Sequence, residues 1–127
     1  MPLKTEMAFA ESYYFLLKIR FGTKIHLHWD IDNTKGSVPP YVLQLLLENA
    51  VKHNIISKHK PLHITIQRQD HTIVVSNNLQ VKPAEGASWG IGLNNIKERY
   101  ALFSDKVIQI TQTPEQFKVL LPILEIQ

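Results

Sequence analysis

The sequence has no cysteine among its 127 residues, which excludes a disulfide-stabilised scaffold and any metal site with thiolate ligands. No apolar run approaches the roughly 18 residues of a membrane span. The first residues also lack the charged-then-apolar form of a signal peptide. The excess of positive charge is small. The net charge is +3 and the basic residues are scattered, so nucleic-acid binding is not expected. These absences predict a soluble, intracellular chain in a reducing compartment.

The chain has the length and composition of one globular domain. Its 127 residues suffice for a hydrophobic core. Apolar residues make up 44% and charged residues 20% of the sequence, values that are typical of a soluble globular protein.

Hydrophobic periodicity and turn signals predict an alternation of helices and strands. The expected elements are a helix over residues 3 to 22, a strand over 24 to 32, a helix over 40 to 55, strands over 62 to 68 and 72 to 77, a loop over 78 to 92, a helix over 93 to 103, and a closing hairpin over 106 to 124. This order indicates an α+β fold with a largely antiparallel sheet and helices on one face.

The first predicted helix carries more apolar residues than one buried stripe needs. Its apolar residues, which include Met7, Ala10, Tyr14, Leu17 and others, cover more than one stripe of the helix. Either the helix packs on something outside this domain, or two of its faces are buried within it.

The stretch "LLLENAVKHN" (residues 45 to 54) places Asn49, Lys52 and His53 on one side of a helix, because they are spaced i, i+3 and i+4. An amide oxygen can bind Mg²⁺, which prefers oxygen ligands and usually keeps substrate phosphates and waters. Lys52 and His53 could neutralise phosphate oxygens. The alternative is an ordinary solvated polar face.

Two further segments offer candidate contacts to a ligand, one through asparagine and one through glycine. In "VVSNNLQ" (residues 74 to 80), Asn77 lies at the end of a predicted strand and could read a nucleobase edge, although asparagine also builds turns. In "GASWGIGLNN" (residues 86 to 95), Gly90 and Gly92 flank Ile91 before a helix, where free backbone N–H groups favour phosphate. This segment is not the dinucleotide-binding fingerprint, because Asn95 replaces the last glycine.

The remaining polar residues suggest no other chemistry. His26, His28 and Asp30 lie on the polar face of the first predicted strand, where His26 and His28 alone make an incomplete metal site. The sequence suggests neither a Ser–His–Asp arrangement nor a pair of acid–base carboxylates.

The order of "PPYVLQLLLENAVKHN" (residues 39 to 54), a strand end and "GIGLNNIKERY" (residues 90 to 100) strongly resembles the ATP-binding domain of sensor histidine kinases, closest to the LytS/YehU-like class. The resemblance covers residues 5 to 124. It implies the Bergerat (GHKL) fold, a two-layer α/β sandwich with a mixed, mostly antiparallel sheet. It also implies a division into residues 1–22, part of the second helix of a dimerisation hairpin, and residues 23–127, the catalytic domain.

The resemblance implies roles for the residues singled out above. Asn49 would bind Mg²⁺, Lys52 and His53 would lie near the phosphates of ATP, and residues 78 to 90 would form a lid. The groups lining the triphosphate would come from the segment Gly90, Ile91, Gly92 and Leu93.

The sequence departs from the wider family in three places. Asn77 would replace the carboxylate that accepts the adenine amino proton, which predicts weaker or less specific binding. Ser88 replaces a glycine of the lid hinge. Leu45 stands where related ATPases keep a water-activating Glu. Glu48 is the remaining candidate for a catalytic carboxylate, but it lies about 100° around the helix from Asn49.

We therefore expect the ATP-binding part of a histidine protein kinase, with ATP and Mg²⁺ as cofactors and no nucleic-acid partner. The resemblance implies a phosphoacceptor histidine upstream of residue 1, a response regulator as partner, and a membrane-bound homodimeric parent in the bacterial inner membrane, with this domain in the cytoplasm. The fragment would not autophosphorylate alone. The alternatives are a degenerate domain acting as an interaction module, motivated by Asn77 and Ser88, and a MutL-like ATPase, disfavoured by Leu45.

Overall fold

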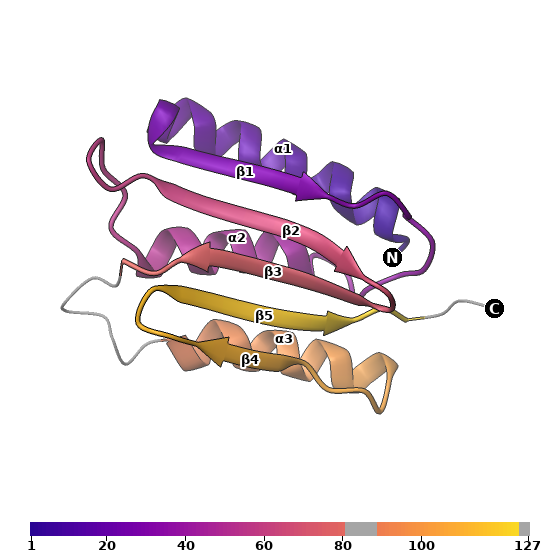
Figure 1. Ribbon diagram of the computed structural model, residues 1–127. Coiled ribbons are helices and arrows are strands. Elements are labelled where there is room, and N and C mark those ends of the chain that lie inside the picture. The colour runs from indigo at the N-terminus through magenta and orange to yellow at the C-terminus, as the bar shows by residue number, and fades with distance from the viewer. Residues whose placement is uncertain (81–88, 125–127) are drawn as a thin grey trace.

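The computed structural model of the chain describes residues 1–80 and 89–124 and consists of one five-stranded sheet with helices on one side (Figure 1). In chain order the elements are α1 (Leu3–Phe21), the 3-10 helix η1 (Gly22–Lys24), β1 (Ile25–Asp30), α2 (Val42–His53), β2 (Leu62–Gln69), β3 (Thr72–Asn78), α3 (Trp89–Phe103), β4 (Gln109–Gln112) and β5 (Gln116–Pro122).

The strand order in the sheet is β1-β2-β3-β5-β4. β1 and β2 are parallel because α2 forms the crossover between them, and the other three neighbouring pairs are antiparallel. The predicted α+β fold with a mixed, mostly antiparallel sheet is therefore confirmed.

The three helices form one layer behind the sheet, with α1 behind β1, α2 behind β2 and β3, and α3 behind β4 and β5 (Figure 1). The core lies between the two layers and is mostly aliphatic. Its fully buried members include Leu43, Leu47, Ile64, Ile73, Ile96 and Leu121. Among the described residues, no helix is both long enough and apolar enough to cross a membrane.

α1 packs on the domain with one face and exposes the other. Ala10 and Leu17 are buried, whereas Phe15, Leu16 and Ile19 keep 65%, 61% and 70% of their surface exposed. The interpretation in which two faces of this helix are buried within the domain is therefore wrong. Packing on a partner outside the domain stays a prediction.

The last helix differs from its sequence prediction. α3 begins at Trp89, four residues before the predicted start, so Gly90 and Gly92 belong to its first turn and not to a loop. Glycine lowers helix propensity by only about 1 kcal/mol, which packing overrides. Residues 81–88, which contain most of the predicted lid and Ser88, lie outside the described residues.

Candidate functional site

α2 separates the predicted polar set by burial. Asn49 is 7% exposed and His53 2% exposed, whereas Glu48 and Lys52 are exposed. The side chains of Asn49 and His53 lie one helical turn apart and belong to the inner side of the helix. The alternative of a solvated polar face is therefore wrong for Asn49 and His53. Lys52 is exposed to solvent.

The Asn49 side chain is buried without a hydrogen bond to any of the described residues. A buried amide without a partner costs roughly 1–3 kcal/mol, so such groups are rare in folded proteins and call for an explanation. A ligand bound against α2 would satisfy the amide. Its oxygen suits Mg²⁺, which often takes only one or two protein ligands and completes its shell with water and phosphate.

A second buried amide, Asn77, lies near the end of β3 and is 6% exposed. Its Nδ2 donates to the backbone carbonyl of Asn78 at 2.8 Å. Within residues 1–80 and 89–124, its Oδ1 accepts no hydrogen bond. Because the bond to Asn78 fixes which end of the amide is the donor, Oδ1 is left as a buried acceptor.

Asn78, the next residue, has a structural role. Its Oδ1 accepts the backbone N–H of His63 at 2.7 Å, and its Nδ2 donates to the carbonyl of Pro61 at 3.0 Å. Both bonds attach the end of β3 to the start of β2. Within the part of the chain that the structure describes, Asn77 is therefore the one of the two consecutive asparagines whose side-chain oxygen accepts no hydrogen bond.

A hydrogen-bonded junction connects α2 to the segment after β3. The Asn54 side chain is fully buried and accepts the backbone N–H of Gln80, while the backbone N–H of Ile55 donates to the Gln80 carbonyl at 2.7 Å. Asn54 and Gln80 were not among the residues predicted from the sequence. The junction brings the end of β3, which carries Asn77, to the end of the helix that carries Asn49.

The same side of the molecule contains the start of α3 (Figure 1, left). N–H groups in the first turn of a helix lack intrahelical acceptors and carry partial positive charge. This turn contains Gly90 and Gly92. Leu93, the last residue of the predicted phosphate-binding segment, follows this turn, and its side chain is buried.

Lys52 and Glu48 also line an open groove of about 560 Å³ between α1 and α2. The other lining residues include Tyr13 and Arg20 of α1. Burial, and to a lesser extent the negative charge of Glu48, raise the pKa of Tyr13. The groove is therefore a surface with side chains of both charges.

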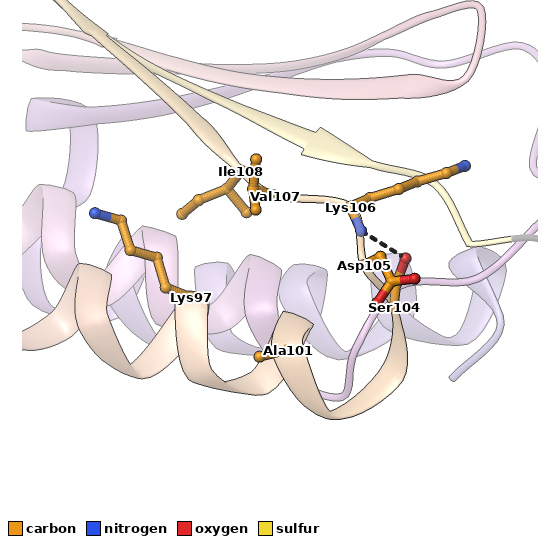
Figure 2. Close-up of a pocket in the computed structure, with 7 residues that line it drawn as sticks. All are labelled: Lys97, Ala101, Ser104, Asp105, Lys106, Val107 and Ile108. Carbon is orange, nitrogen blue, oxygen red and sulfur yellow. Dashed lines mark hydrogen bonds between the residues drawn. The ribbon is translucent and has the colours of Figure 1, made fainter.

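A separate hollow of about 570 Å³ lies at the other end of α3 (Figure 2). Lys97 and Ala101 line it from the helix, and residues 104–108 from the following loop. Figure 2 shows the backbone N–H of Lys106 donating to the Ser104 hydroxyl, at 3.0 Å. Among the described lining residues of this hollow, none is a predicted site residue.

His26, His28 and His63 form a cluster on the open face of the sheet. The rings of His26 and His63 stack with centroids 4.6 Å apart, and His28 Nε2 lies 3.3 Å from His63 Nδ1. Across the described part of the chain, no group of three or more His, Asp or Glu residues could hold a metal ion.

No protein-family model matches the chain. In sequence, it is 32% identical over 127 residues to the sensor protein LytS of Streptococcus mutans, and the match covers 87% of this chain and 22% of that relative. The chain thus spans less than a quarter of the length of this relative.

Solved structures share the fold. The cytoplasmic segment of histidine kinase QseC superimposes with a TM-score of 0.69 at 14% identity, covering 98% of this chain and 76% of that one. The catalytic domain of histidine kinase ThkA gives a TM-score of 0.56 at 14% identity, covering 98% of this chain and 96% of that one. The chain is a homologue of the LytS sensor proteins and has the α/β fold of a histidine kinase catalytic domain.

Proposed function

We propose that this chain is the catalytic domain of a two-component sensor histidine kinase and that it binds ATP with Mg²⁺ beside α2. Homology to LytS sensor proteins and the kinase-domain fold support the class. The buried Asn49 amide, which has no hydrogen-bond partner among residues 1–80 and 89–124, is the observation that carries the proposed site. The fold alone would not require this amide, because an aliphatic residue would fill a buried position at lower cost.

Asn49 would supply an oxygen ligand to Mg²⁺, with phosphates and water completing the shell. The ion would neutralise charge on the triphosphate. Lys52 is exposed at the rim of the site, and its flexible ammonium would contact phosphate oxygens. His53, the next residue of α2, is buried and would lie near the phosphates as well. The N–H groups of the first turn of α3, around Gly90, Ile91 and Gly92, and the amide of Leu93 are the proposed remaining phosphate contacts.

Asn77 would contact the base. One N–H of its Nδ2 donates to the Asn78 carbonyl, and Oδ1, which accepts no hydrogen bond from the described residues, would be the acceptor offered to the base. An acceptor matches the exocyclic amino group of adenine and opposes the keto oxygen of guanine at the equivalent position. The uncharged amide forms a weaker bond than a carboxylate, which supports modest affinity for ATP.

The domain would orient the γ-phosphoryl group for attack by a histidine outside this chain. The histidine nitrogen would form the new P–N bond, the bond to the β,γ-bridging oxygen would break, and ADP would leave. Positioning and charge neutralisation supply most of the catalysis in such transfers. No carboxylate of this chain is assigned a catalytic role, and Glu48 is exposed.

The exposed apolar face of α1 supports the proposed division of the chain. Through Phe15, Leu16 and Ile19, residues 1–22 would complete a dimerisation hairpin whose other helix carries the phosphoacceptor histidine. Residues 23–127 would be the catalytic domain. The parent would be a homodimer in the bacterial cell membrane that passes the phosphoryl group to an aspartate of a response regulator.

A second candidate is a degenerate domain that no longer binds ATP and acts as an interaction module. The observation that favours it is the neutral Asn77 at the proposed base contact. The two functions predict opposite results in a binding experiment.

Calorimetric titration of ATP into the chain, with and without Mg²⁺, tests the proposal. We expect magnesium-dependent binding that Asn49→Ala abolishes. Gln44→Ala is the matched control, because Gln44 is an amide on another face of α2 and is only partly buried. Binding that both substitutions leave unchanged would remove Asn49 from the site. The absence of heat at millimolar ATP in folded protein would favour the interaction module.

A further inference from the structure

Glu6 of α1 occupies the position of a helix cap for α2. Its Oε2 accepts the backbone N–H of Tyr41 and its Oε1 accepts that of Leu43, both at 3.0 Å. These donors flank the first residue of α2. Glu6 is 35 and 37 residues away from them in sequence, so the cap comes from a different helix.

α2 has no cap of its own. Its N-cap residue, Tyr41, has a left-handed backbone (φ 65°), makes no side-chain cap hydrogen bond, and is followed by no acidic residue in the first turn. The backbone N–H groups at the start of a helix need acceptors and attract negative charge. The Glu6 carboxylate supplies both, with one oxygen for each donor.

Glu6 is also buried, with 1% of its surface exposed. Burial raises the pKa of its carboxyl group, and the hydrogen bonds from Leu43 and Tyr41 oppose that shift. A buried carboxylate is tolerated only where its hydrogen bonds are made. The two hydrogen bonds therefore restrict both sliding and rotation of α1 relative to the start of α2.

The segment before α2 is tied to the other elements as well. Arg99 of α3 donates to the carbonyl of Pro40 at 3.2 Å, and the N–H of Leu3 donates to the carbonyl of Gly36 at 3.0 Å. The start of α2 is thus the point at which α1 and α3 are both hydrogen-bonded to the same short segment.

Asn49 lies six residues beyond Leu43, less than two helical turns or about 9 Å along the same helix. A helix of this length moves as a rigid rod, so a rotation or shift imposed at its first turn moves the Asn49 amide. We propose that Glu6 is a positioning residue for the nucleotide site: it fixes α2 on α1 and thereby sets the orientation of Asn49. The part of this inference that concerns nucleotide affinity rests on the proposed function.

Glu6→Gln tests this role with nearly unchanged shape. Glutamine has one acceptor oxygen, so its NH₂ group would face one of the two N–H donors and that bond would be lost. Leu17→Ala is the control: Leu17 is buried on α1 and makes no hydrogen bond to α2 in the described residues, so its substitution weakens packing without removing the cap.

The first readout is the NMR signal of the Asn49 side-chain amide without nucleotide, assigned by its loss in Asn49→Ala. We expect Glu6→Gln to shift this signal and Leu17→Ala to leave it in place. The second readout is the affinity for Mg·ATP, which we expect to fall about tenfold in Glu6→Gln, as for residues that orient a metal ligand, with no comparable loss in Leu17→Ala.

If Glu6→Gln lowers the free energy of unfolding but changes neither the Asn49 signal nor the affinity more than Leu17→Ala does, Glu6 is a structural cap only and the inference is overturned. If the Asn49 signal shifts but the unmodified chain binds no ATP, the positioning role stands and the proposed function fails. The NMR readout therefore separates the two failures.

Discussion

Asn54 and Gln80 join two parts of the chain that the sequence separates: the Oδ1 of Asn54 accepts the backbone N–H of Gln80 at 2.6 Å. The Asn54 Nδ2 donates to the carbonyl of Ala50 at 2.9 Å, and the residue has no exposed surface. The side chain thus stops α2 and also holds the segment that follows β3.

Replacing Asn54 with alanine should therefore destabilise the fold. The backbone N–H of Gln80 would lose its acceptor, and an unsatisfied buried donor costs roughly 1–3 kcal/mol. Urea denaturation of Asn54→Ala would measure the loss. Gln109→Ala, at an exposed position of β4, is the control and should change the free energy of unfolding by less than about 0.5 kcal/mol. Equal effects of the two substitutions would contradict the junction.

Gly36 and Gly22 both have positive φ values but different surroundings. Gly36 has φ +98°, and an added Cβ would overlap the Cγ2 methyl of Ile123, whereas Gly22 has φ +60° and open space around it. Both alanine variants carry the cost of the backbone conformation. Only Gly36→Ala adds overpacking, which typically costs about 1–3 kcal/mol, so it should be the less stable variant by about that amount.

Ile123→Leu separates the two causes. Leucine keeps the volume of isoleucine but has no methyl branch at Cβ, so the overlapping group is removed. Thermal unfolding should show that Gly36→Ala costs less in the Ile123→Leu background than alone. An unchanged cost would assign the whole effect to the backbone conformation.

The histidine cluster predicts a loss of stability in acid. Burial, and then the nearby His26 and His28, lower the pKa of His63 below its ordinary value of 6.5. The unfolded chain then binds the proton more readily than the folded one. Above pH 6.5 the neutral His63 leaves the free energy of unfolding at its full value. As the pH falls from 6.5 through the folded pKa of His63, protonation of the unfolded chain lowers that free energy.

Denaturation between pH 7.5 and 5 would test this sign. We expect His63→Gln to flatten the decline in stability toward low pH. His59→Gln, at an exposed histidine outside the cluster, should leave the decline unchanged. A stability that rises as the pH falls through this range, and that His63→Gln abolishes, would reverse the assignment.

The sequence predicted the fold well because its patterns are local. Alternation in β1, the glycine that follows α1 and the apolar stripe of α2 each reflect secondary structure that the chain adopts. The start of α3 lies four residues before its predicted position, because glycine lowers helix propensity and a stretch with Gly90 and Gly92 favours a loop, whereas tertiary packing tolerates glycine in a first turn.

The candidate site was predicted less completely because burial is a tertiary property. Spacing placed Asn49, Lys52 and His53 on one side of a helix but could not show that only Asn49 and His53 are buried. Glu6 and Asn54 were missed because each acts on a distant part of the chain, and no local pattern signals a cap donated by another helix.

The two consecutive asparagines at the end of β3 give the sharpest test of the base contact. Asn77→Asp would place a carboxylate at the proposed adenine contact, and charge-assisted hydrogen bonds are roughly twice as strong as neutral ones. We expect ATP affinity to rise roughly tenfold, about 1.4 kcal/mol, with a larger preference for ATP over GTP. Stability should fall, because the Nδ2 bond to the Asn78 carbonyl is lost.

Asn78→Asp is the matched control for this substitution. It also loses an Nδ2 donor, here to the Pro61 carbonyl, but its Oδ1 still accepts the N–H of His63 and does not face the proposed site. Both variants should therefore be destabilised, and only Asn77→Asp should bind ATP more tightly in calorimetry. An equal change of affinity in the two variants would mean that the end of β3 acts on the nucleotide through fold stability and that Asn77 does not read the base.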